Sequence, residues 1–346
     1  MNYPKRILFL GETYRADAQT WIKGIEGVSK IDIDTLEVKS TSTRLGRIFN
    51  FLGFGIEILK TNFSKSYDLV LAERATSYGL FSLFVRAKKR IVAQQGITDA
   101  WPENGFSGVY KRLFQKWVYK RVDLIHAWGE VMVPAMIASQ ARPERILVLP
   151  KGINLEKYQK WHSKDQNLAI VTRSLTEVYH HQDILKALGI LKEKGIKLRL
   201  TIVGDGNLMK PLEALVEDLD LKEQVNFLGR VPNSLLPKLL QKAAIYLSVP
   251  ETEGVSASLF EAMASGCFPI VTDLPGTRAF IKNGENGLLV PVNSPTKIAD
   301  AIEDYLENQA RYHLGILENR AFIEMHVDLK KNMEAIWSKY LEIFQN

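Results

Sequence analysis

Cysteine and long apolar segments are almost absent from this sequence. Its 346 residues contain one cysteine, Cys267, so neither a disulfide framework nor a zinc site built on cysteines can form, and we expect a reducing compartment. The longest apolar run, residues 48–59, is interrupted by Asn50 and Glu57 and is shorter than the roughly 20 residues that a membrane span needs. The sequence turns polar from Gly11 onward, in GETYRADAQ, unlike a signal peptide. We therefore expect neither a membrane span nor a disulfide-stabilised fold.

A complete dinucleotide-binding fingerprint is also missing. The segment VGDGNLMK, residues 203–210, contains Gly204 and Gly206, but Met209 stands at the position of the third glycine. The segment also lies far from the first strand–helix–strand unit, which such a fingerprint normally opens. The sequence therefore disfavours a dehydrogenase.

Length and composition predict two soluble domains. Hydrophobic residues make up 46% of the chain and charged residues 24%, which is ordinary for a globular protein. A chain of this length fits two domains of about 150–200 residues better than one core. Residues 1–165 hold 26 Lys and Arg against 16 Asp and Glu, a net charge of +10, whereas the remainder has a net charge of −4. The basic first half suits nucleic acid, anionic lipid or a phosphorylated substrate.

Short apolar runs of strand length alternate with longer helical stretches in both halves. This alternation predicts strand–helix–strand units with parallel sheets, so each half is expected to be a doubly wound α/β domain. The lysine-rich residues 151–167 separate the two series and are interpreted as a linker. The expected strands are 6–11, 31–36, 68–73, 90–95, 123–128 and 145–150 in the first half, and 168–173, 198–204, 224–229, 244–249 and 268–273 in the second.

These patterns define three segments. We expect an N-terminal domain at residues 1–160 and a C-terminal domain at residues 161–325. Residues 326–346 are expected to form a helix that packs back toward the N-terminal domain. Its apolar face consists of Met333, Ile336, Trp337, Tyr340 and Leu341.

Two glutamates flank a turn and the start of a helix in residues 250–266, PETEGVSASLFEAMASG. Helix formers predominate after the Pro and Gly of PETEG, so a helix is expected to start near Ser256. The N–H groups at its start, at the carboxyl edge of a sheet, suit a diphosphate. Glu261, about two turns into the helix, then suits a ribose diol, whereas Glu253 faces a sugar beyond the phosphates. The alternative is that Glu253 is an ordinary turn residue and Glu261 a solvated helix residue.

These residues resemble the E-x7-E element and EAMA motif of the retaining glycosyltransferases of family 4, with Gly266 and Pro269 completing the motif. Further segments resemble the family in the same order along the chain. They are LPKGINLEKY (149–158), VTRSL (171–175), IVGDGNLMKPLE (202–213), VNFLGRV (225–231) and NGENGLLVPV (283–292). The resemblance implies an α/β fold of the GT-B type, with two facing Rossmann-like doubly wound domains, a deep interdomain cleft and a C-terminal crossover helix.

The resemblance implies a nucleotide-sugar site in the second half. Arg173 is implied to neutralise the diphosphate leaving group, and Glu253 to hold the transferred sugar. The donor-binding residues that it implies are Gly11, Arg173, His180, Gly204, Gly206, Gly229, Arg230, Gly254, Val255, Ser256, Ala257, Ser258 and Glu261. No cofactor and no metal ion is expected beside the nucleotide-sugar substrate, for which UDP is favoured over GDP.

One departure from the family pattern concerns the second phosphate-binding cation. The family places a lysine five residues after the arginine, where this sequence has Val178. His180 aligns with that lysine after a two-residue insertion, and its charge depends on pH. Lys151 and Lys210 are alternative replacements. The other reading of all three residues is that they lie on the surface without a ligand.

A second departure concerns the acceptor side. Family members often have a His-Gly pair after a strand of the first domain, where this sequence has Gln95 and Gly96. Gln95 can form hydrogen bonds but cannot act as a base. Asp99, or Glu12 in the loop after the first strand, is expected to orient or deprotonate the acceptor hydroxyl, and Gly11 lets that loop approach the donor. The catalytic candidates are therefore Glu253, Arg173, Gln95 and Asp99.

Basic and aromatic residues predominate in two stretches of the first half, residues 44–60 and 109–121. In the second stretch Tyr110, Phe114 and Trp117 recur at helical spacing among five Lys and Arg. An aromatic face flanked by cations is typical of a helix in an anionic membrane interface. The alternative is a helix that its own domain covers, with solvated lysines. Nucleic acid is not expected, because no recognition motif accompanies the charge.

The sequence therefore predicts a retaining, metal-independent glycosyltransferase. It is expected to move a hexose or N-acetylhexosamine from a nucleotide sugar to a hydroxyl of a lipid-linked glycan or another surface-polysaccharide precursor. The expected location is cytoplasmic, on the inner face of the cell membrane. The alternatives are a nucleotide-sugar epimerase or hydrolase on the same fold, and a membrane-docked glycan-binding protein with a degenerate site.

Overall fold

The computed structural model describes residues 3–39, 43–94, 96, 106–161 and 163–345. The chain forms two compact units. Unit 1 consists of Met1–Lys151 together with Leu329–Asn346, and unit 2 consists of Gly152–Asp328. Unit 1 is therefore built from two separate stretches of sequence.

Unit 1 contains a six-stranded parallel sheet in the order β2-β1-β3-β4-β5-β6. Its strands are β1 (Ile7–Leu10), β2 (Ile33–Leu36), β3 (Tyr67–Glu73), β4 (Ala87–Gln94), β5 (Leu124–Ala127) and β6 (Ile146–Val148). The helices that connect them include α1 (Ala16–Ser29), α2 (Arg44–Ser64), α3 (Leu80–Ser82), α5 (Phe106–Arg121) and α6 (Val133–Ala138), and a π-helical turn, η1 (Arg74–Gly79), follows β3. Short 3-10 turns lie at Glu130–Met132 and Pro143–Arg145.

The last described helix, α14 (Leu329–Glu342), completes unit 1 by packing against α1. Its buried side chains include Met333, Ile336 and Tyr340, which confirms the amphipathic helix predicted from the sequence. The Tyr340 hydroxyl lies 2.6 Å from Nδ1 of the buried His126 on β5. Met333 also packs closely against Gly24 of α1. The core of unit 1 therefore includes residues from both of its stretches.

Unit 2 contains a second six-stranded parallel sheet, in the order β12-β11-β10-β7-β8-β9. Its strands are β7 (Asp165–Thr172), β8 (Arg199–Val203), β9 (Val225–Gly229), β10 (Ala243–Ser248), β11 (Phe268–Thr272) and β12 (Leu288–Val290). Its helices are α7 (His181–Glu193), α8 (Met209–Asp218), α9 (Leu236–Lys242), α10 (Ala257–Ala264), α11 (Pro275–Arg278), α12 (Pro295–Glu307) and α13 (Gln309–His326). Short 3-10 turns lie at Leu155–Lys157 and Glu177–Tyr179.

Alternating side chains of the strands place one apolar core on each face of this sheet. On β7, Ala169 and Val171 pack into the cluster formed with α7, α8 and α12. Ile170, between them, packs into the cluster formed with α9, α10 and α13. A strand directs successive side chains to opposite faces, so near-continuous apolar runs fit a sheet that is covered on both sides. Unit 2 is therefore doubly wound.

The strand predictions from the sequence are confirmed at all eleven places, whereas β12 was not predicted. The expected domain boundary after residue 160 differs from the division into units. Residues 152–160 belong to unit 2 because the Ile153 N–H donates to the Val327 carbonyl oxygen over 2.8 Å, and because Ile153 and Tyr158 are buried in one of its cores. Most of the expected linker is therefore part of unit 2. Its last residues, from Asp165, form the start of β7.

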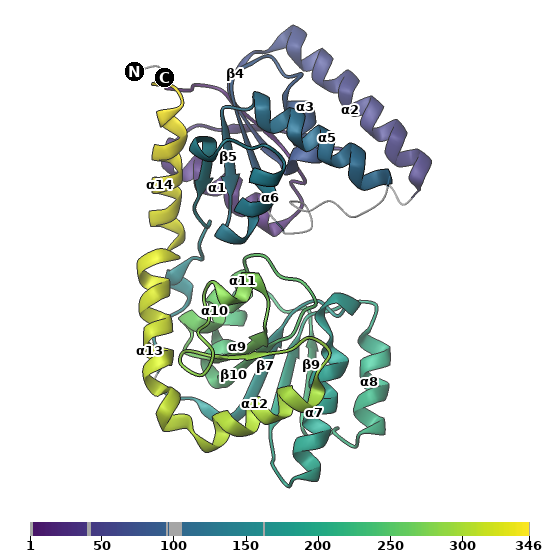
Figure 1. The fold of residues 1–346 in the computed structure, drawn as a ribbon, viewed down its shortest axis with the longest axis vertical. Coiled ribbons are helices and arrows are strands. Elements are labelled where there is room, and N and C mark those ends of the chain that lie inside the picture. Colours follow the sequence, from purple (N-terminus) through teal and green to yellow (C-terminus); the bar gives the residue numbers. More distant parts are fainter. Residues whose placement is uncertain (1–2, 40–42, 95, 97–105, 162, 346) are drawn as a thin grey trace. The chain divides into compact units, whose positions relative to one another are not determined.

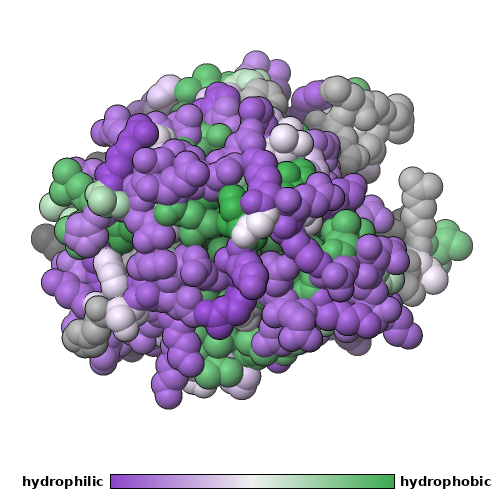
Figure 2. All heavy atoms as spheres, turned by 90° about the horizontal axis from the view of Figure 1, so that it is seen from below, coloured by the Kyte–Doolittle hydropathy of each residue, from purple (hydrophilic) through white to green (hydrophobic). Residues whose placement is uncertain are grey.

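An exposed apolar stripe runs along α2, on the side away from its buried residues Phe54 and Ile58. The stripe consists of Leu45, Phe49, Leu52, Ile56, Leu59 and Phe63, each at least 55% exposed. These six positions recur at spacings of three and four residues and therefore share one helix face. The face shown in Figure 2 instead carries mostly hydrophilic side chains with smaller apolar areas between them. Among the described residues no helix is long and apolar enough to cross a bilayer.

Candidate active site

The predicted donor residues of unit 2 meet at the carboxyl edge of its sheet. Arg173 directly follows β7, and the turn at residues 250–254 follows β10. These two strands are parallel neighbours, so the segments after them lie side by side. Ligands of doubly wound sheets bind at this edge.

Arg173 is the centre of a polar cluster. Its Nε donates to Ser248 Oγ over 3.1 Å, and its Nη2 donates to both the Glu253 carboxylate and Ser256 Oγ. The side chains of Arg173 and Glu253 are only 11% and 14% exposed. Against the effect of burial, the charges of Tyr246 and Glu253 and a hydrogen bond with Tyr246 favour the charged guanidinium and hold its pKa above the usual range. The structure thus brings Arg173 together with Glu253 and Ser256, which follow it by 80 and 83 positions in the sequence.

Main-chain contacts hold the turn at residues 250–254 in place. Thr272 Oγ1 donates to the Pro250 carbonyl oxygen over 2.8 Å, and the Glu251 N–H donates to the Val178 carbonyl oxygen over 2.9 Å. Gly276 of α11 lies so close to the backbone of Glu253 and Gly254 that a Cβ there would be within 2.4 Å of their carbonyl oxygens. A glycine is therefore required at position 276, which the sequence analysis did not identify.

Helix α10 starts next to Arg173, as predicted. Ser256 is its N-cap residue, and its Oγ accepts a hydrogen bond from the Leu259 N–H. The same Oγ accepts from Arg173. The first N–H groups of a helix lack partners within the helix and attract anions. The cap residue therefore fixes the guanidinium and the helix start relative to each other.

Glu261 lies on α10 beyond this cluster and is half-buried. Burial raises its pKa above the usual range, against the opposite effects of a hydrogen bond from Tyr158 and the charge of Arg173. Tyr158 is 4% exposed, and burial, together with the charge of Glu261 and the hydrogen bond to it, raises the pKa of its phenol. Tyr158 therefore orients Glu261, a role that the sequence analysis missed because Tyr158 falls in the expected linker.

Two glycine positions shape the loop after β8. Gly204 has φ +146°, and a Cβ there would lie 2.1 Å from the Arg173 carbonyl oxygen. A Cβ at Gly206 would lie 2.2 Å from the carbonyl oxygen of Leu175. These glycines therefore let the loop pack against the backbone at Arg173. Gly229 ends β9 and accepts the Gly204 N–H over 2.9 Å, which places it and the exposed Arg230 beside the same loop.

Two adjacent histidines follow Arg173. His180, the predicted cation, has its Nδ1 3.4 Å from Asp183 and its Nε2 3.9 Å from Glu251. His181 is 1% exposed, and neither of its ring nitrogens has a hydrogen-bond partner among the described residues. Burial, followed by the charges of Arg173 and His180, lowers the pKa of His181 to about 4, so its ring is neutral at pH 7. No feature of the sequence distinguishes the partly exposed environment of one histidine from the burial of the other.

The predicted acceptor-side residues lie in unit 1 or outside the described residues. Gly11 follows β1, where a Cβ would lie 2.7 Å from the buried Glu73. The Glu12 N–H donates to Glu73 Oε2 over 2.9 Å, and the Glu12 carboxylate pairs with Arg74 at 2.7 Å. These residues form a charged cluster at the carboxyl edge of the unit 1 sheet. Gln95 and Asp99 lie outside the described residues.

The alternative cations are placed differently. Lys151 belongs to unit 1, where its Nζ donates to the Asp17 carbonyl oxygen over 3.1 Å and lies 4.6 Å from the Trp128 ring centroid. Burial lowers its pKa to about 8. Lys210 is exposed in the first turn of α8 in unit 2. Lys151 is thus already engaged by its own unit.

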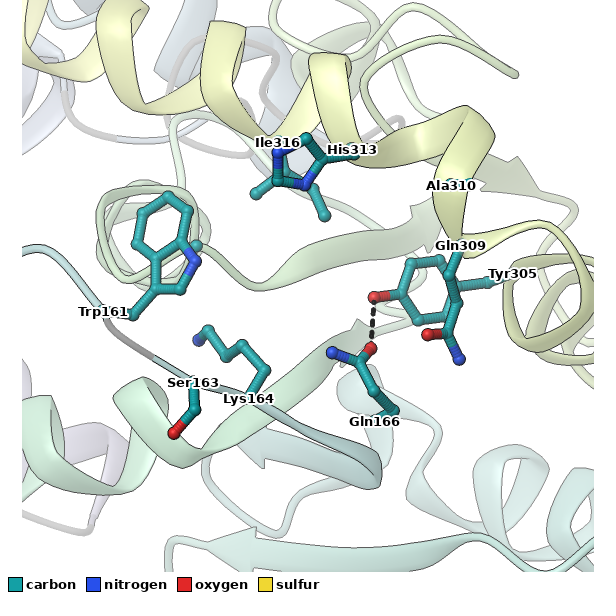
Figure 3. Close-up of a pocket in the computed structure, with 10 residues that line it drawn as sticks. Trp161, Ser163, Lys164, Gln166, Tyr305, Gln309, Ala310, His313 and Ile316 are labelled. Atoms are coloured by element: carbon teal, nitrogen blue, oxygen red, sulfur yellow. Dashed lines mark hydrogen bonds between the residues drawn. The ribbon is translucent and has the colours of Figure 1, made fainter.

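A cavity of unit 2, of about 470 Å³, is shown in Figure 3. Its walls include Trp161, Ser163 and Lys164 before β7 and residues of α12 and α13, and Tyr305 donates to Gln166 of β7 over 3.4 Å. Lys164 donates to the carbonyl oxygens of Leu240 and Ala243, each at 2.8 Å, at the carboxyl end of α9. A cation at this helix end is stabilising, so Lys164 has a structural role there. Among the described residues no cluster of three or more His, Cys, Asp or Glu suits a metal ion.

Comparison of the sequence with known proteins gives consistent matches. The family model of the glycosyl transferases group 1 matches residues 154–322, which lie within unit 2 and contain the Arg173 cluster. The chain is 26% identical over 267 residues to the N-acetylgalactosamine-N,N'-diacetylbacillosaminyl-diphospho-undecaprenol 4-alpha-N-acetylgalactosaminyltransferase of Campylobacter jejuni, covering 75% of this chain and 72% of that protein. It is 30% identical over 158 residues to the putative glycosyltransferase EpsD of Bacillus subtilis, which is 46% of this chain and 35% of that protein.

Solved structures match the fold over nearly the whole chain. HepE of Anabaena in complex with UDP has a TM-score of 0.77 and 16% sequence identity, covering 97% of this chain and 99% of that chain. Sucrose-phosphate synthase of Thermosynechococcus elongatus has a TM-score of 0.80 and 13% identity, covering 98% and 99%. At such identities the likeness concerns the fold, which is the GT-B fold predicted from the sequence.

Proposed function

Because residues 154–322 of this chain belong to the glycosyl transferases group 1, and the chain has the GT-B fold, we propose that the protein is a retaining glycosyltransferase. It transfers a hexose or N-acetylhexosamine from a nucleotide sugar, with UDP favoured over GDP, to a hydroxyl of a lipid-linked glycan. The observation that carries this proposal is the Arg173–Glu253–Ser256 cluster at the start of α10. The C. jejuni relative, whose name contains a diphospho-undecaprenol acceptor, and the UDP complex of HepE support the acceptor and donor classes.

The cluster suits the departure of a nucleoside diphosphate. Negative charge develops on the leaving diphosphate as the bond to the sugar breaks, and donors fixed beforehand stabilise that charge best. Arg173 supplies a fixed cation, and the first N–H groups of α10 supply further donors. These groups provide the stabilisation in a reaction that needs no metal ion.

The two glutamates have separate roles in this proposal. Glu261, oriented by Tyr158, accepts hydrogen bonds from the ribose hydroxyls. Glu253, which accepts a hydrogen bond from Arg173, holds hydroxyls of the transferred sugar. This keeps the sugar positioned while the acceptor attacks from the face that the diphosphate leaves. Attack from that face retains the configuration of the anomeric carbon.

A thermal-shift experiment tests the function. A nucleotide sugar that binds only the folded protein at a hundredfold excess over its Kd stabilises it by about 2.7 kcal/mol, so UDP-sugars should raise the melting temperature. The Glu261→Ala variant should lose most of that shift and turn over the donor more slowly. Undiminished turnover by this variant would falsify the assignment. NMR of the product should show retention at the anomeric carbon, and inversion would contradict the mechanism.

The apolar stripe of α2 and the basic helix α5 form the membrane-docking surface of this proposal. The six stripe residues are exposed along one face, which suits a helix lying in the interface plane. Helix α5 adds five Lys and Arg and exposed apolar residues such as Tyr110 and Leu113. Anionic lipid attracts such a cationic helix. Docking on the inner face of the cell membrane places the enzyme where a lipid-linked acceptor is presented.

Replacing Leu52 and Ile56 by serine should weaken vesicle binding. Each is more than half exposed on the stripe, and burial of such a side chain in the bilayer is worth about 1.5 kcal/mol or more, so the double variant should partition at least about tenfold less. Flotation with phosphatidylglycerol vesicles measures this. The matched control, Leu314→Ser with Met325→Ser, changes exposed apolar residues of unit 2 and should float like the wild type. Equal losses in both variants, or no flotation of the wild type at low salt, would contradict docking through α2.

A further inference from the structure

A small pocket lies between α5 and the end of α6 in unit 1, apart from the Arg173 cluster of unit 2. It has a volume of about 270 Å³. Arg112 and Lys116 line it together with Gln140, and Val109 and Leu113 contribute apolar surface. Ser139, on the opposite wall, donates its hydroxyl hydrogen to Gln115 over 3.0 Å. The pocket therefore offers cationic and amide donors beside an apolar surface.

In the part of the chain that the structure describes, the two cations have no counter-charge. Arg112 and Lys116 are four residues apart and lie on one face of α5, where like charges repel and destabilise the helix. Helix α5 contains no acidic residue, and no carboxylate of the described residues pairs with either cation. An anion bound between them would remove the repulsion and gain charge-assisted hydrogen bonds.

The pocket is continuous with the membrane-docking surface. Asn62 of α2 donates to the Phe84 carbonyl oxygen over 2.8 Å, and the Phe84 ring lies 6.0 Å from Trp117 of α5. Phe84 is itself 55% exposed. These contacts join the end of the α2 stripe to α5. An anion in the pocket would therefore lie on the same helix as part of the proposed membrane-docking surface.

We propose that this pocket binds the diphosphate of the lipid-linked acceptor, an inference that rests on the proposed function. Arg112, Lys116 and Gln140 hold the phosphate oxygens, and Val109 and Leu113 contact the first carbons of the lipid. Two cations in one pocket suit a diphosphate better than the single charge of a phospholipid headgroup.

Binding of a soluble isoprenoid diphosphate tests the proposal. Farnesyl diphosphate below its critical micelle concentration serves as the probe, with calorimetry or intrinsic fluorescence as the readout. The Arg112→Gln, Lys116→Gln double variant should bind it at least about tenfold more weakly, because each loses a charge-assisted contact. Farnesol and dihexanoyl phosphatidylglycerol should not compete with the probe at equal concentration.

The matched control is the Lys111→Gln, Lys120→Gln double variant, which removes the same charge from α5 outside the pocket. It should bind the probe within about twofold of the wild type. Equal losses in the two variants would show that the net charge of α5 attracts the probe and would overturn the proposal. Equal competition by phosphatidylglycerol would overturn it as well, in favour of a phospholipid headgroup site. UDP-sugar binding, measured on the same variants, should not change. A wild type that binds the probe but no nucleotide sugar would refute the proposed function and leave the pocket standing.

Discussion

Replacing Arg173 by alanine is expected to lower the rate of nucleotide-sugar turnover by about 10²- to 10³-fold, the usual loss when one fixed donor to developing negative charge is removed. Nε and Nη2 of Arg173 are held by Ser248, Glu253 and Ser256. The guanidinium is thus oriented before the donor binds. Steady-state kinetics with a saturating acceptor measure the loss.

Two further variants separate the chemistry of Arg173 from its structural role. Arg173→Lys keeps a charge but cannot contact Ser248 and Glu253 together, so it should recover only part of the rate. Arg199→Ala is the matched control, because Arg199 starts β8 at the opposite edge of the sheet and pairs with Asp165 at the surface. It should leave turnover unchanged. A full rate in Arg173→Ala, or an equal loss in Arg199→Ala, would refute the role of Arg173.

Replacing Glu253 by glutamine should change turnover and product binding in opposite directions. Glutamine keeps one acceptor oxygen but replaces the other by an NH2 donor and removes the negative charge, so the hydrogen bonds from the sugar hydroxyls weaken and turnover should fall by about 10²-fold. The same change removes the negative charge beside Arg173, so UDP alone should bind up to about fivefold more tightly. Kinetics and UDP calorimetry on one preparation measure both effects.

A control for this variant is Glu285→Gln, which changes an exposed carboxylate of unit 2 that pairs only weakly with Lys282, at 3.9 Å. It should alter neither quantity. Weaker UDP binding by Glu253→Gln would show that Glu253 supports the nucleotide itself, in contradiction to the role assigned to it.

The fold was largely predictable because its strands are short apolar runs buried on both faces. Runs such as residues 243–248 are continuous in sequence, and strand–helix alternation leaves few topologies open. The strand β12 was missed because it has three residues and only Val290 is fully buried. The expected linker was wrong for a similar reason. Most residues of this segment are polar, so its composition does not indicate that Ile153 and Tyr158 are buried. Partners distant in sequence bury both side chains.

The candidate site was predictable where one local motif determines it. The PETEG turn and the Ser256 cap give the start of α10 directly, and the position of Arg173 after β7 follows from the parallel sheet. Contacts between distant segments were not predictable. The hydrogen bond from Tyr158 to Glu261 and the approach of Gly276 to Glu253 depend on how loops after different strands pack. His180 and His181 are adjacent in the sequence, but His181 is buried whereas His180 pairs with Asp183. The sequence alone does not indicate which of the two rings is buried.

The return of α14 to unit 1 has a consequence for synthesis on the ribosome. Domains generally fold as units while the chain emerges, and those nearer the N-terminus usually fold first. Here all residues of Gly152–Asp328 emerge before Leu329–Asn346, so unit 2 can be complete while unit 1 still lacks Met333 and Tyr340. Until then His126 and the α1 face around Gly24 remain uncovered. The usual order is thus reversed, and the half of the chain made first is the half that finishes folding last.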